Sequence, residues 1–268
     1  MLLITGATGF LGTYLRQTIH LPYLGISSRL SSENNITNAN LLDIHQLQPI
    51  FHAHKISHII HLAAITYNTQ DQNFDGNISM MQNLIQSALP QKIPLTYVST
   101  FAATYKDDPY AKSKRDAEKL LKNSNLPHTI LRPTMIIGPG SKDLALFQKL
   151  ARFNVLPLVN GGNQLIQPIQ VDQVTKWLTY FLTNPPTGKT HILSGARPLT
   201  TKELLLSLNS NLKILHIPPV LIQNKLTKKF PKFYELTKTF TNDLIPKKLP
   251  IQILEKQLQF DSLAYTIK

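Results

Sequence analysis

The chain has 268 residues, of which 42% are hydrophobic and none is cysteine. Such a chain can bury a sizeable core, and the lack of cysteine excludes disulfides, thiolate catalysis and cysteine zinc sites. No apolar run approaches the roughly 20 residues of a membrane span, and the N-terminus lacks a basic lead and a small-residue cleavage site, so we expect a soluble, cytoplasmic protein with no membrane partner. The formal net charge of +13 is spread along the chain with little aromatic interleaving, which favours a solvated basic surface over nucleic-acid binding, with weak attraction to anionic ligands as an alternative.

The N-terminus carries the most informative pattern of the chain. An apolar strand, Leu2–Thr5, runs directly into three glycines spaced three apart, Gly6, Gly9 and Gly12, and apolar residues then recur at helical spacing. Gly6 permits a tight turn, Gly9 lets the backbone approach a pyrophosphate, and Gly12 lets the following helix pack against the strand. Because a helix N-terminus attracts negative charge, this pattern predicts a nucleotide-binding turn.

Short apolar strands alternate with helical patterns along the rest of the chain, which is typical of a parallel sheet with helices on both faces. The further predicted strands are Tyr23–Ser27, Asn40–Leu42, Ser57–Leu62, Leu95–Ser99, His128–Arg132, Leu165–Ile169 and His191–Leu193. The predicted helices are His45–His54, Asn77–Ala88, a helix from Tyr110, Leu144–Phe153 and Val171–Leu182. From about Leu199 the pattern becomes helical and rich in lysine.

A tyrosine and a lysine one helical turn apart form the second informative pattern. Tyr110 and Lys114 lie on the same face of the predicted helix, so the ammonium can sit beneath the phenol. A nearby positive charge favours the phenolate and lowers the tyrosine pKa, so the pair can exchange a proton with a substrate hydroxyl. Thr100, at the sheet edge where open α/β folds bind ligands, can hold the substrate oxygen. Considered alone, Tyr110 and Lys114 also fit the exposed start of a helix. Considered alone, Thr100 also fits a residue that caps the next turn.

Six motifs then follow one another in a characteristic order. They are Thr5–Gly12 (TGATGFLG), His61–Ala64 (HLAA), Asn77 opening a helix, Val98-Ser99-Thr100, Tyr110-x-x-x-Lys114, and Leu131–Thr134 (LRPT) with Gly138-Pro139-Gly140. Together they resemble the short-chain dehydrogenase/reductase superfamily, in its extended or atypical branch of NAD-dependent epimerase/dehydratase-like proteins. The resemblance also includes Gly161-Gly162-Asn163 and Pro168–Asp172.

This resemblance implies an α/β fold with a Rossmann-type doubly wound parallel sheet. An NAD(P)-binding Rossmann domain would span residues 1–195, with substrate-side segments inserted around residues 138–167. Residues 196–268 would form a small, mostly helical C-terminal region that binds substrate. Within that region, Ile217–Ile222 suggests an apolar wall over the site.

The resemblance also implies a role for each matching residue. Thr100 would orient the substrate oxygen, Tyr110 would transfer the proton, and Lys114 would lower the tyrosine pKa and bind the ribose. The cofactor would be bound by Gly6, Gly9, Phe10, Leu11 and Gly12 at the pyrophosphate, Asp43 and Ile44 at the adenine, Leu62, Ala63 and Ala64 at the ribose of the nicotinamide, Asn77 under the cofactor loop, and Pro133 to Ile136 beside the nicotinamide.

The charge after the second strand bears on the choice of cofactor. A carboxylate there would bind the ribose 2′-hydroxyl and repel a 2′-phosphate. Here the strand is followed by Ser28 and Arg29, and the first carboxylate, Glu33, comes four residues later. Hydroxyl and guanidinium groups suit a phosphate, so NADP(H) is favoured and NAD(H) is the alternative. Stacking of Arg29 on the adenine, with no preference at the 2′ position, fits the same residues.

Two departures from the family pattern argue against a nucleotide-sugar substrate. Only ten positions separate Thr100 from Tyr110, about half the usual spacing in sugar-nucleotide epimerases, and Ile166 stands where those enzymes have a pyrophosphate-binding arginine. The leading hypothesis is therefore an NAD(P)-dependent oxidoreductase that moves hydride to or from a small carbonyl or hydroxyl compound. A non-catalytic dinucleotide sensor and a sugar epimerase or dehydratase are the alternatives, and the sequence leaves open whether the chain forms a homodimer.

Four histidines, His52, His54, His58 and His61, fall within ten residues of one another. They straddle a predicted helix, a turn and a strand, and no carboxylate joins them. We therefore predict no metal site.

Overall fold

The computed structural model describes residues 1–67, 73–184 and 186–218. The chain divides into two compact units. The first comprises residues 1–133 and 171–193, and the second, among the described residues, 134–170 and 194–218. Most of the C-terminal region predicted for residues 196–268, including Pro219–Ile222 of the expected apolar wall, lies outside the described residues.

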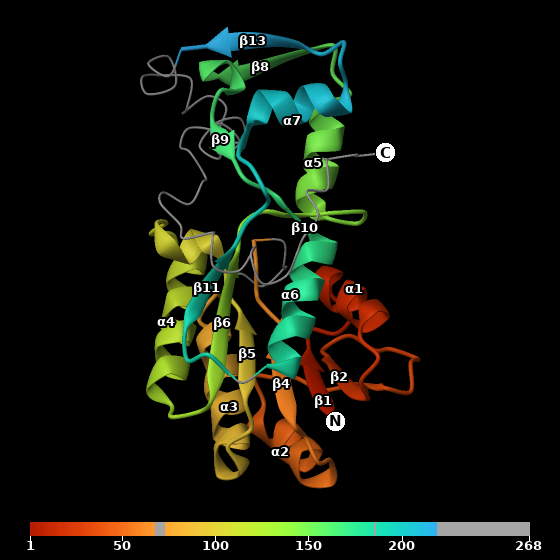
Figure 1. Ribbon diagram of the computed structural model, residues 1–268, viewed down its shortest axis with the longest axis vertical. Helices are drawn as coiled ribbons and strands as arrows, with labels where there is room; N and C mark the ends of the chain where they lie inside the picture. The colour runs from red at the N-terminus through yellow and green to blue at the C-terminus, as the bar shows by residue number, and fades with distance from the viewer. Residues whose placement is uncertain (68–72, 185, 219–268) are drawn as a thin grey trace. The chain divides into compact units, whose positions relative to one another are not determined.

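The first unit is built on a parallel sheet of seven strands in the order β11-β6-β5-β4-β1-β2-β3 (Figure 1). The strands are β1 (Leu2–Thr5), β2 (Tyr23–Ser27), β3 (Ile36–Asn38), β4 (His58–His61), β5 (Leu95–Val98), β6 (His128–Pro133) and β11 (Thr190–Leu193). The chain direction across the sheet reverses between β1 and β4, which is the switch point where doubly wound sheets bind ligands. The predicted Rossmann-type fold is confirmed.

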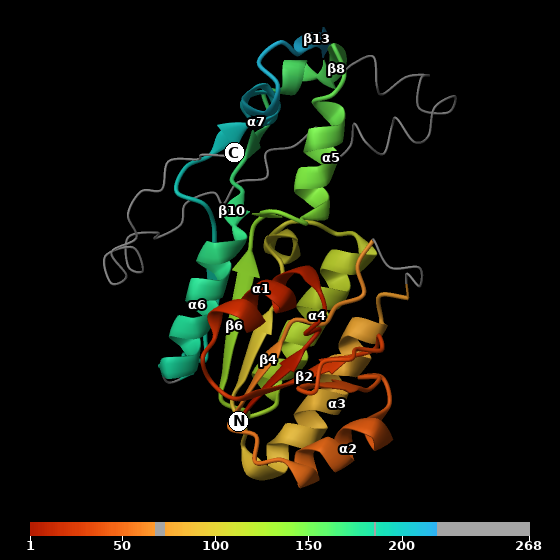
Figure 2. The ribbon, with the colours of Figure 1, turned by 90° about the vertical axis from the view of Figure 1, so that its right-hand side faces the viewer.

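Helices cover both faces of this sheet (Figure 2). They are α1 (Phe10–Thr18) and α6 (Val171–Thr183) on one face, and α2 (Ile44–Ala53), α3 (Gly76–Ala88) and α4 (Pro109–Asn123) on the other, with short 3₁₀ turns η1 (Leu89–Gln91) and η2 (Phe101–Thr104). Strand residues Leu3, Ile59 and Leu95 pack with Leu84 of α3 and Leu121 of α4, all of them fully buried. This core fixes the helices against the strands and so sets the positions of the loops at the carboxyl edge.

The third strand of the sheet differs from the sequence-based expectation. The predicted strand Asn40–Leu42 is wrong, because β3 is Ile36–Asn38, which pairs with β2 through Gly25 and Ile36. The side chain of Asn40 accepts a hydrogen bond of 3.0 Å from the Leu42 amide. Asparagine stabilises turns through this local contact, which competes with strand pairing.

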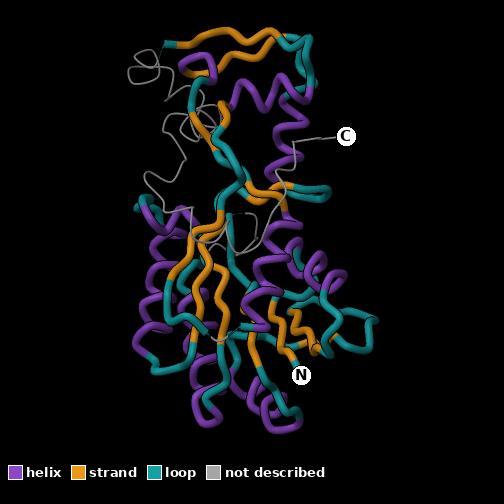
Figure 3. Tube along the Cα trace, in the orientation of Figure 1, coloured by secondary structure: helices purple, strands orange, loops and turns teal. Residues whose placement is uncertain are grey.

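The described part of the second unit combines two helices with three pairs of short strands. Its elements are β7 (Ile136–Ile137) with β10 (Ile169–Gln170), β9 (Leu165–Ile166) with β12 (Leu199–Thr200), β8 (Val155–Val159) with β13 (Lys213–Ile217), the turn η3 (Asn160–Gly162), α5 (Lys142–Leu150) and α7 (Thr201–Leu208). Figure 3 shows β8 and β13 side by side. Their register makes them a parallel pair. The predicted strand Leu165–Ile169 is divided into β9 and β10, since Pro168 lacks the N–H that a continuous ladder needs.

Candidate functional site

The glycine turn lies at the carboxyl end of β1 and leads into α1. A Cβ on Gly6 would lie 2.7 Å from the Ala63 amide nitrogen, and one on Gly12 would lie 2.4 Å from the Gly6 carbonyl oxygen, so neither position has room for a side chain. Gly6 also has a φ of 68°, in the left-handed region. Gly9, the N-cap of α1, offers no side-chain oxygen to the first helical turn. Those N–H groups are therefore available to an anion, and the turn fits a pyrophosphate.

The segment after β4 is held against this turn from two sides. Thr5 Oγ1 accepts a hydrogen bond of 3.4 Å from the amide of Ala63. Asn77 Oδ1 accepts one of 2.8 Å from the amide of Ile65, and Asn77 Nδ2 donates one of 3.0 Å to the Ile65 carbonyl. Leu62, Ala63 and Ala64 are thus fixed at the sheet edge, and all three are half-buried.

Asn77 also connects this segment to the helix that carries the candidate base. Its Nδ2 donates a hydrogen bond of 3.1 Å to Ser113 Oγ, and Ser113 Oγ donates one of 2.8 Å to the carbonyl of Tyr110. Sequence reasoning missed Ser113, although its place between Tyr110 and Lys114 on a helix could have suggested it. One side chain, Asn77, therefore links the segment after β4 to the start of α4.

Tyr110 lies in the first turn of α4. Asp108 caps this helix by accepting a hydrogen bond of 2.9 Å from the Ala111 amide. The ring of Tyr110 packs against Tyr67, 5.2 Å between centroids, and against Phe74 at 5.9 Å. Tyr67 donates a short hydrogen bond to Asp108. The pKa of Tyr67 is raised, mainly by burial and to a smaller extent by this hydrogen bond. Tyr110 thus sits in an aromatic cluster that was not predicted.

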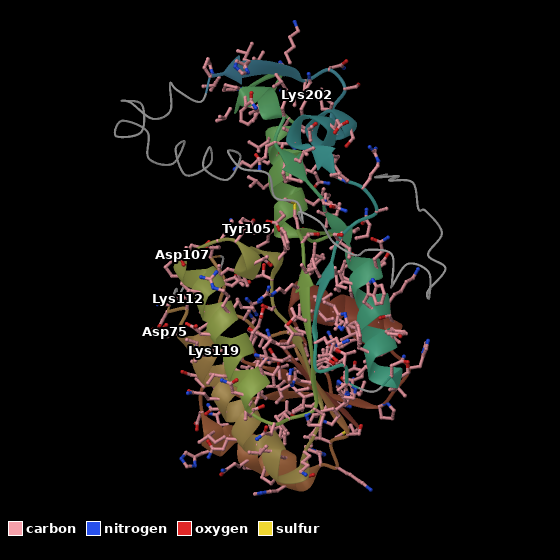
Figure 4. All side chains as sticks on the ribbon, turned by 60° about the vertical axis from the view of Figure 1, so that its left-hand side comes forward. Asp75, Tyr105, Asp107, Lys112, Lys119 and Lys202 are labelled. Atoms are coloured by element: carbon pink, nitrogen blue, oxygen red, sulfur yellow. The ribbon has the colours of Figure 1, made fainter. Side chains whose placement is uncertain are left out.

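Lys114 is almost fully buried, with 1% of its surface exposed. Its Nζ donates a hydrogen bond of 3.0 Å to the Val98 carbonyl at the end of β5. Burial lowers the pKa of Lys114 to about 7, while the nearby Glu118 raises it. Figure 4 shows Lys112 and Lys119 on the outer side of α4, where both are exposed. Lys114 is therefore distinct from its neighbours, being turned into the unit toward the sheet edge.

A neutral histidine and a tyrosine lie beneath this lysine. Lys114 Nζ is 4.4 Å from the centroid of the Tyr97 ring. His61 stacks on Tyr97 at 5.2 Å and forms a hydrogen bond of 2.7 Å with Thr5 Oγ1 through Nδ1. Burial, with a smaller contribution from Lys114, lowers the pKa of His61 to about 3, so this histidine is uncharged at neutral pH. Neither His61 nor Tyr97 was predicted to belong to the site.

A buried carboxylate lies one turn beyond Lys114. Glu118 is 2% exposed and accepts hydrogen bonds of 2.8 and 2.6 Å from Nε and Nη2 of Arg132. Ser99 Oγ donates to the same carboxylate at 2.5 Å. This network joins α4 to the ends of β5 and β6. Its members are far apart in sequence, although the arginine of the LRPT motif could have signalled it.

Thr100 has a structural contact at the position where a substrate oxygen was expected. Its hydroxyl accepts a hydrogen bond of 3.3 Å from the Ala102 amide and so caps η2. This contact uses a lone pair of the hydroxyl and leaves its hydrogen, so Thr100 can still donate to a ligand.

Asp43 is also engaged locally. It caps α2 by accepting a hydrogen bond of 2.9 Å from the His45 amide and one of 3.0 Å from Gln46 Nε2. Ile44 is the first residue of that helix. Of the residues predicted beside the nicotinamide, Pro133 ends β6 in the first unit, whereas Ile136 belongs to β7 of the second.

Ser28 and Arg29 are exposed directly after β2. The preceding Ser27 is buried and its hydroxyl lies 2.8 Å from that of Thr8 in the glycine turn. Glu33 forms an ion pair with Arg16 of α1. The first carboxylate after β2 is thereby neutralised, while Arg29 stays open to solvent.

Within residues 1–67, 73–184 and 186–218, no group of three or more His, Asp or Glu side chains could hold a metal ion. His58 instead lies 2.8 Å from Thr96 Oγ1 through Nε2, and burial lowers its pKa to about 4. In the same part of the chain, no helix is long and apolar enough to cross a membrane.

Residues 2–193 match the model of the NAD dependent epimerase/dehydratase family. No curated protein sequence matches the chain significantly.

Many solved structures share the fold. UDP-glucose 4-epimerase from Thermotoga maritima, solved with UDP-glucose, has a TM-score of 0.67 at 18% identity, covering 81% of this chain and 85% of that one. dTDP-glucose 4,6-dehydratase from Bacillus anthracis, in complex with NAD, has a TM-score of 0.69 at 15% identity, covering 81% and 84%. RMD from Pseudomonas aeruginosa, complexed with NADPH, has a TM-score of 0.65 at 21% identity, covering 81% and 85%.

Proposed function

Since this chain belongs to the NAD dependent epimerase/dehydratase family, we propose that it binds a nicotinamide dinucleotide and transfers hydride to or from a carbonyl or hydroxyl substrate, with Tyr110 as the acid/base. Membership of the family confirms the predicted resemblance, and with it the prediction of an enzyme. The tyrosine's role, the cofactor's 2′ group and the substrate are the parts that we propose.

One observation carries the proposal: Lys114 is buried one helical turn from Tyr110, at the same sheet edge as the glycine turn. A lysine is seldom fully buried unless its charge has a use or a partner. Here the ammonium is held at the end of β5 by the Val98 carbonyl. Asn77 links the segment beside the glycine turn to the backbone of Tyr110 through Ser113.

The chain's own residues supply binding and proton transfer. A bound nicotinamide would supply or accept the hydride. The first turn of α1 would hold the pyrophosphate by its N–H groups, as the side-chain-free turn allows. Lys114, protonated below about pH 7, would bind a ribose hydroxyl and favour the Tyr110 phenolate. Tyr110 would then take a proton from a substrate hydroxyl or give one to a carbonyl, with Thr100 donating to the same oxygen.

We propose NADP(H) as the preferred cofactor. Arg29 is exposed after β2, where a 2′-phosphate would accept hydrogen bonds from a guanidinium. Glu33, the nearest carboxylate in sequence, is paired with Arg16 and so repels a phosphate less than a free carboxylate would. NADPH is the ligand of the compared Pseudomonas protein and NAD that of the Bacillus one.

The family supports a second candidate, in which the hydride is returned to the same substrate. Sugar epimerases and dehydratases are among the compared proteins. The short spacing from Thr100 to Tyr110 and the apolar Ile166 favour a small substrate over a nucleotide sugar. We also propose that the second unit selects the substrate.

Single-turnover kinetics with a panel of small carbonyl compounds test the role of Tyr110. We expect Tyr110→Phe to keep its dinucleotide affinity and to slow hydride transfer by about 10²- to 10⁴-fold. Net oxidation of the reduced dinucleotide identifies a reductase, whereas an isomerised or dehydrated product without net oxidation identifies the second candidate. If Tyr110→Phe preserves both binding and the cellular phenotype, the catalytic proposal is wrong and a dinucleotide sensor replaces it.

A further inference from the structure

We propose that Tyr97 is a positioning residue for Lys114: its ring, stacked on His61, forms a seat that holds the lysine ammonium at the carboxyl end of β5. This inference rests on the proposed function, since it concerns how Lys114 is presented to the dinucleotide. Nothing in the family resemblance or in the motif pattern assigns a role to Tyr97.

The seat is defined by the contacts of the ammonium. In the described part of the chain, Lys114 Nζ donates one hydrogen bond, to the Val98 carbonyl. A single acceptor leaves the ammonium free to swing around that bond. The face of the Tyr97 ring, 4.4 Å from Nζ, supplies the second contact. The attraction between a cation and an aromatic face is strongest where water is excluded, as it is around this buried lysine.

The ring itself is fixed in place. Tyr97 is 1% exposed, and its backbone pairs with that of His61 across β5 and β4. The two rings stack with an angle of 16° between their planes, and the hydrogen bond to Thr5 holds the histidine. The seat is therefore a layered arrangement of lysine, tyrosine and histidine, anchored on strands beside the glycine turn.

The ring, rather than the hydroxyl, makes this contact. Among the described residues the Tyr97 hydroxyl is buried and has no hydrogen-bond partner. Such a group is unfavourable for folding, so phenylalanine can replace tyrosine without breaking a hydrogen bond there. Tyr97→Phe is thus a conservative variant that keeps the seat, while Tyr97→Leu and Tyr97→Met remove its aromatic face.

The charges around Lys114 make its protonation sensitive to the seat. Among the described residues, the ionisable groups that interact with Lys114 are Tyr97 on β5, His61 on β4 and Glu118 on its own helix. Tyr110 lies one turn earlier on the same helix. His61 is uncharged at neutral pH and adds no repulsion. Glu118 favours the ammonium, and burial opposes it. Loss of the aromatic face removes a second favourable contact, so the lysine would lose its proton at lower pH.

The test measures dissociation constants of NADH and NADPH between about pH 6 and about pH 9. This range spans the lowered pKa of Lys114, about 7. The proteins are the wild type, the three Tyr97 variants, Lys114→Met and the core control Phe51→Leu. Phe51 is buried in the same core as Tyr97 but belongs to α2. The melting temperature of each protein reports its stability separately from its affinity.

We expect wild type and Tyr97→Phe to share one curve, in which binding weakens as Lys114 loses its proton. Tyr97→Leu and Tyr97→Met would bind about tenfold more weakly at the acidic end, with the midpoint moved to lower pH. Phe51→Leu would lose stability and keep its affinity and midpoint.

Three outcomes would overturn the inference. If Tyr97→Leu and Tyr97→Met bind like Phe51→Leu, the seat has no role, and the proposed function stands. If Tyr97→Phe loses as much affinity as Tyr97→Leu, the hydroxyl acts instead of the ring. If the wild type binds neither dinucleotide, the proposed function and this inference both fail.

Discussion

Arg132 donates two hydrogen bonds to the carboxylate of Glu118, of 2.8 Å from Nε and 2.6 Å from Nη2. The carboxylate is 2% exposed and the guanidinium side chain 17%, so the pair is largely removed from water. Because Glu118 follows Lys114 by one turn of α4 and Arg132 lies in β6, the pair fixes the helix that carries the candidate base against the sheet. Two parallel hydrogen bonds, one to each carboxylate oxygen, fix the orientation of the guanidinium as well as strengthening the ion pair.

Removing the guanidinium should leave a buried carboxylate without its main partner. We expect Arg132→Met to lower the free energy of unfolding by about 3 kcal/mol, measured by urea denaturation. The double variant Arg132→Met with Glu118→Gln should recover part of that loss, since the uncompensated charge is gone. If Arg132→Met lowers the free energy of unfolding by less than about 0.5 kcal/mol, the pair contributes no more than a weak surface ion pair does.

The buried lysine should make stability depend on pH. Burial lowers the pKa of Lys114 to about 7, whereas in the unfolded chain it returns toward about 10.4. Between these values the unfolded state binds more protons, so the free energy of unfolding rises with pH. Below about 7 both states are protonated and this contribution is flat.

Two lysine variants isolate this effect in pH-dependent denaturation. Lys114→Met should remove the rise between about pH 7 and about pH 10. The exposed Lys112, two residues away on the same helix, serves as the control, and Lys112→Met should keep the wild-type slope. Equal slopes in all three proteins would contradict the buried position of Lys114.

Replacing Asn77 should affect both stability and binding. Asn77→Leu leaves the amide and carbonyl of Ile65 without their partner, and we expect a loss of about 2 kcal/mol in the free energy of unfolding. The segment beside the glycine turn would loosen, so NADPH affinity should fall by about tenfold. Asn83 offers a matched control on the same helix, because its Nδ2 donates one hydrogen bond of 2.9 Å, to the Leu41 carbonyl.

Isothermal calorimetry separates the two asparagines. Asn83→Ala should lose stability and retain NADPH affinity. Should Asn77→Leu bind NADPH as tightly as Asn83→Ala does, Asn77 would be a structural residue of α3 with no influence on cofactor binding by the segment after β4.

Arg29 should determine the preference between the two dinucleotides. We expect Arg29→Ala to weaken NADPH binding by about tenfold or more and to change NADH binding by less than about twofold, because only NADPH carries the 2′-phosphate. Fluorescence titration with both ligands measures this, and Lys112→Ala controls for the loss of one positive charge. Equal weakening of both ligands would instead favour stacking of Arg29 on the adenine.

Much of the fold could be predicted because the strongest signals are local. β2 has the predicted bounds, and the glycine turn leads from β1 into α1 as expected. β3 could not be predicted, since Ile36 is its one apolar residue and it lies at the sheet edge. β8 was missed because Pro157 interrupts its apolar run, a pattern that argues against a strand unless the proline lies at an edge.

The candidate site could be predicted only where motifs mark it. Tyr110 and Lys114 share a helix, so their spacing in sequence predicts their common face. The contacts of Lys114 with Tyr97, and of Glu118 with Arg132, join different elements and leave no periodic pattern in the sequence. The lowered pKa of Lys114 likewise depends on burial, which only the packed structure reveals.

Titration of the purified protein with NADPH and NADH is the most direct test of the central claim, that the chain binds a nicotinamide dinucleotide. The wild type should bind at least one of them with a dissociation constant of about 1–100 μM, and Gly12→Val, whose side chain would collide with the Gly6 carbonyl, should bind neither. Thermal melting of the Gly12→Val protein must confirm that it remains folded. Absence of binding to the wild type at about 1 mM of either dinucleotide would contradict the account.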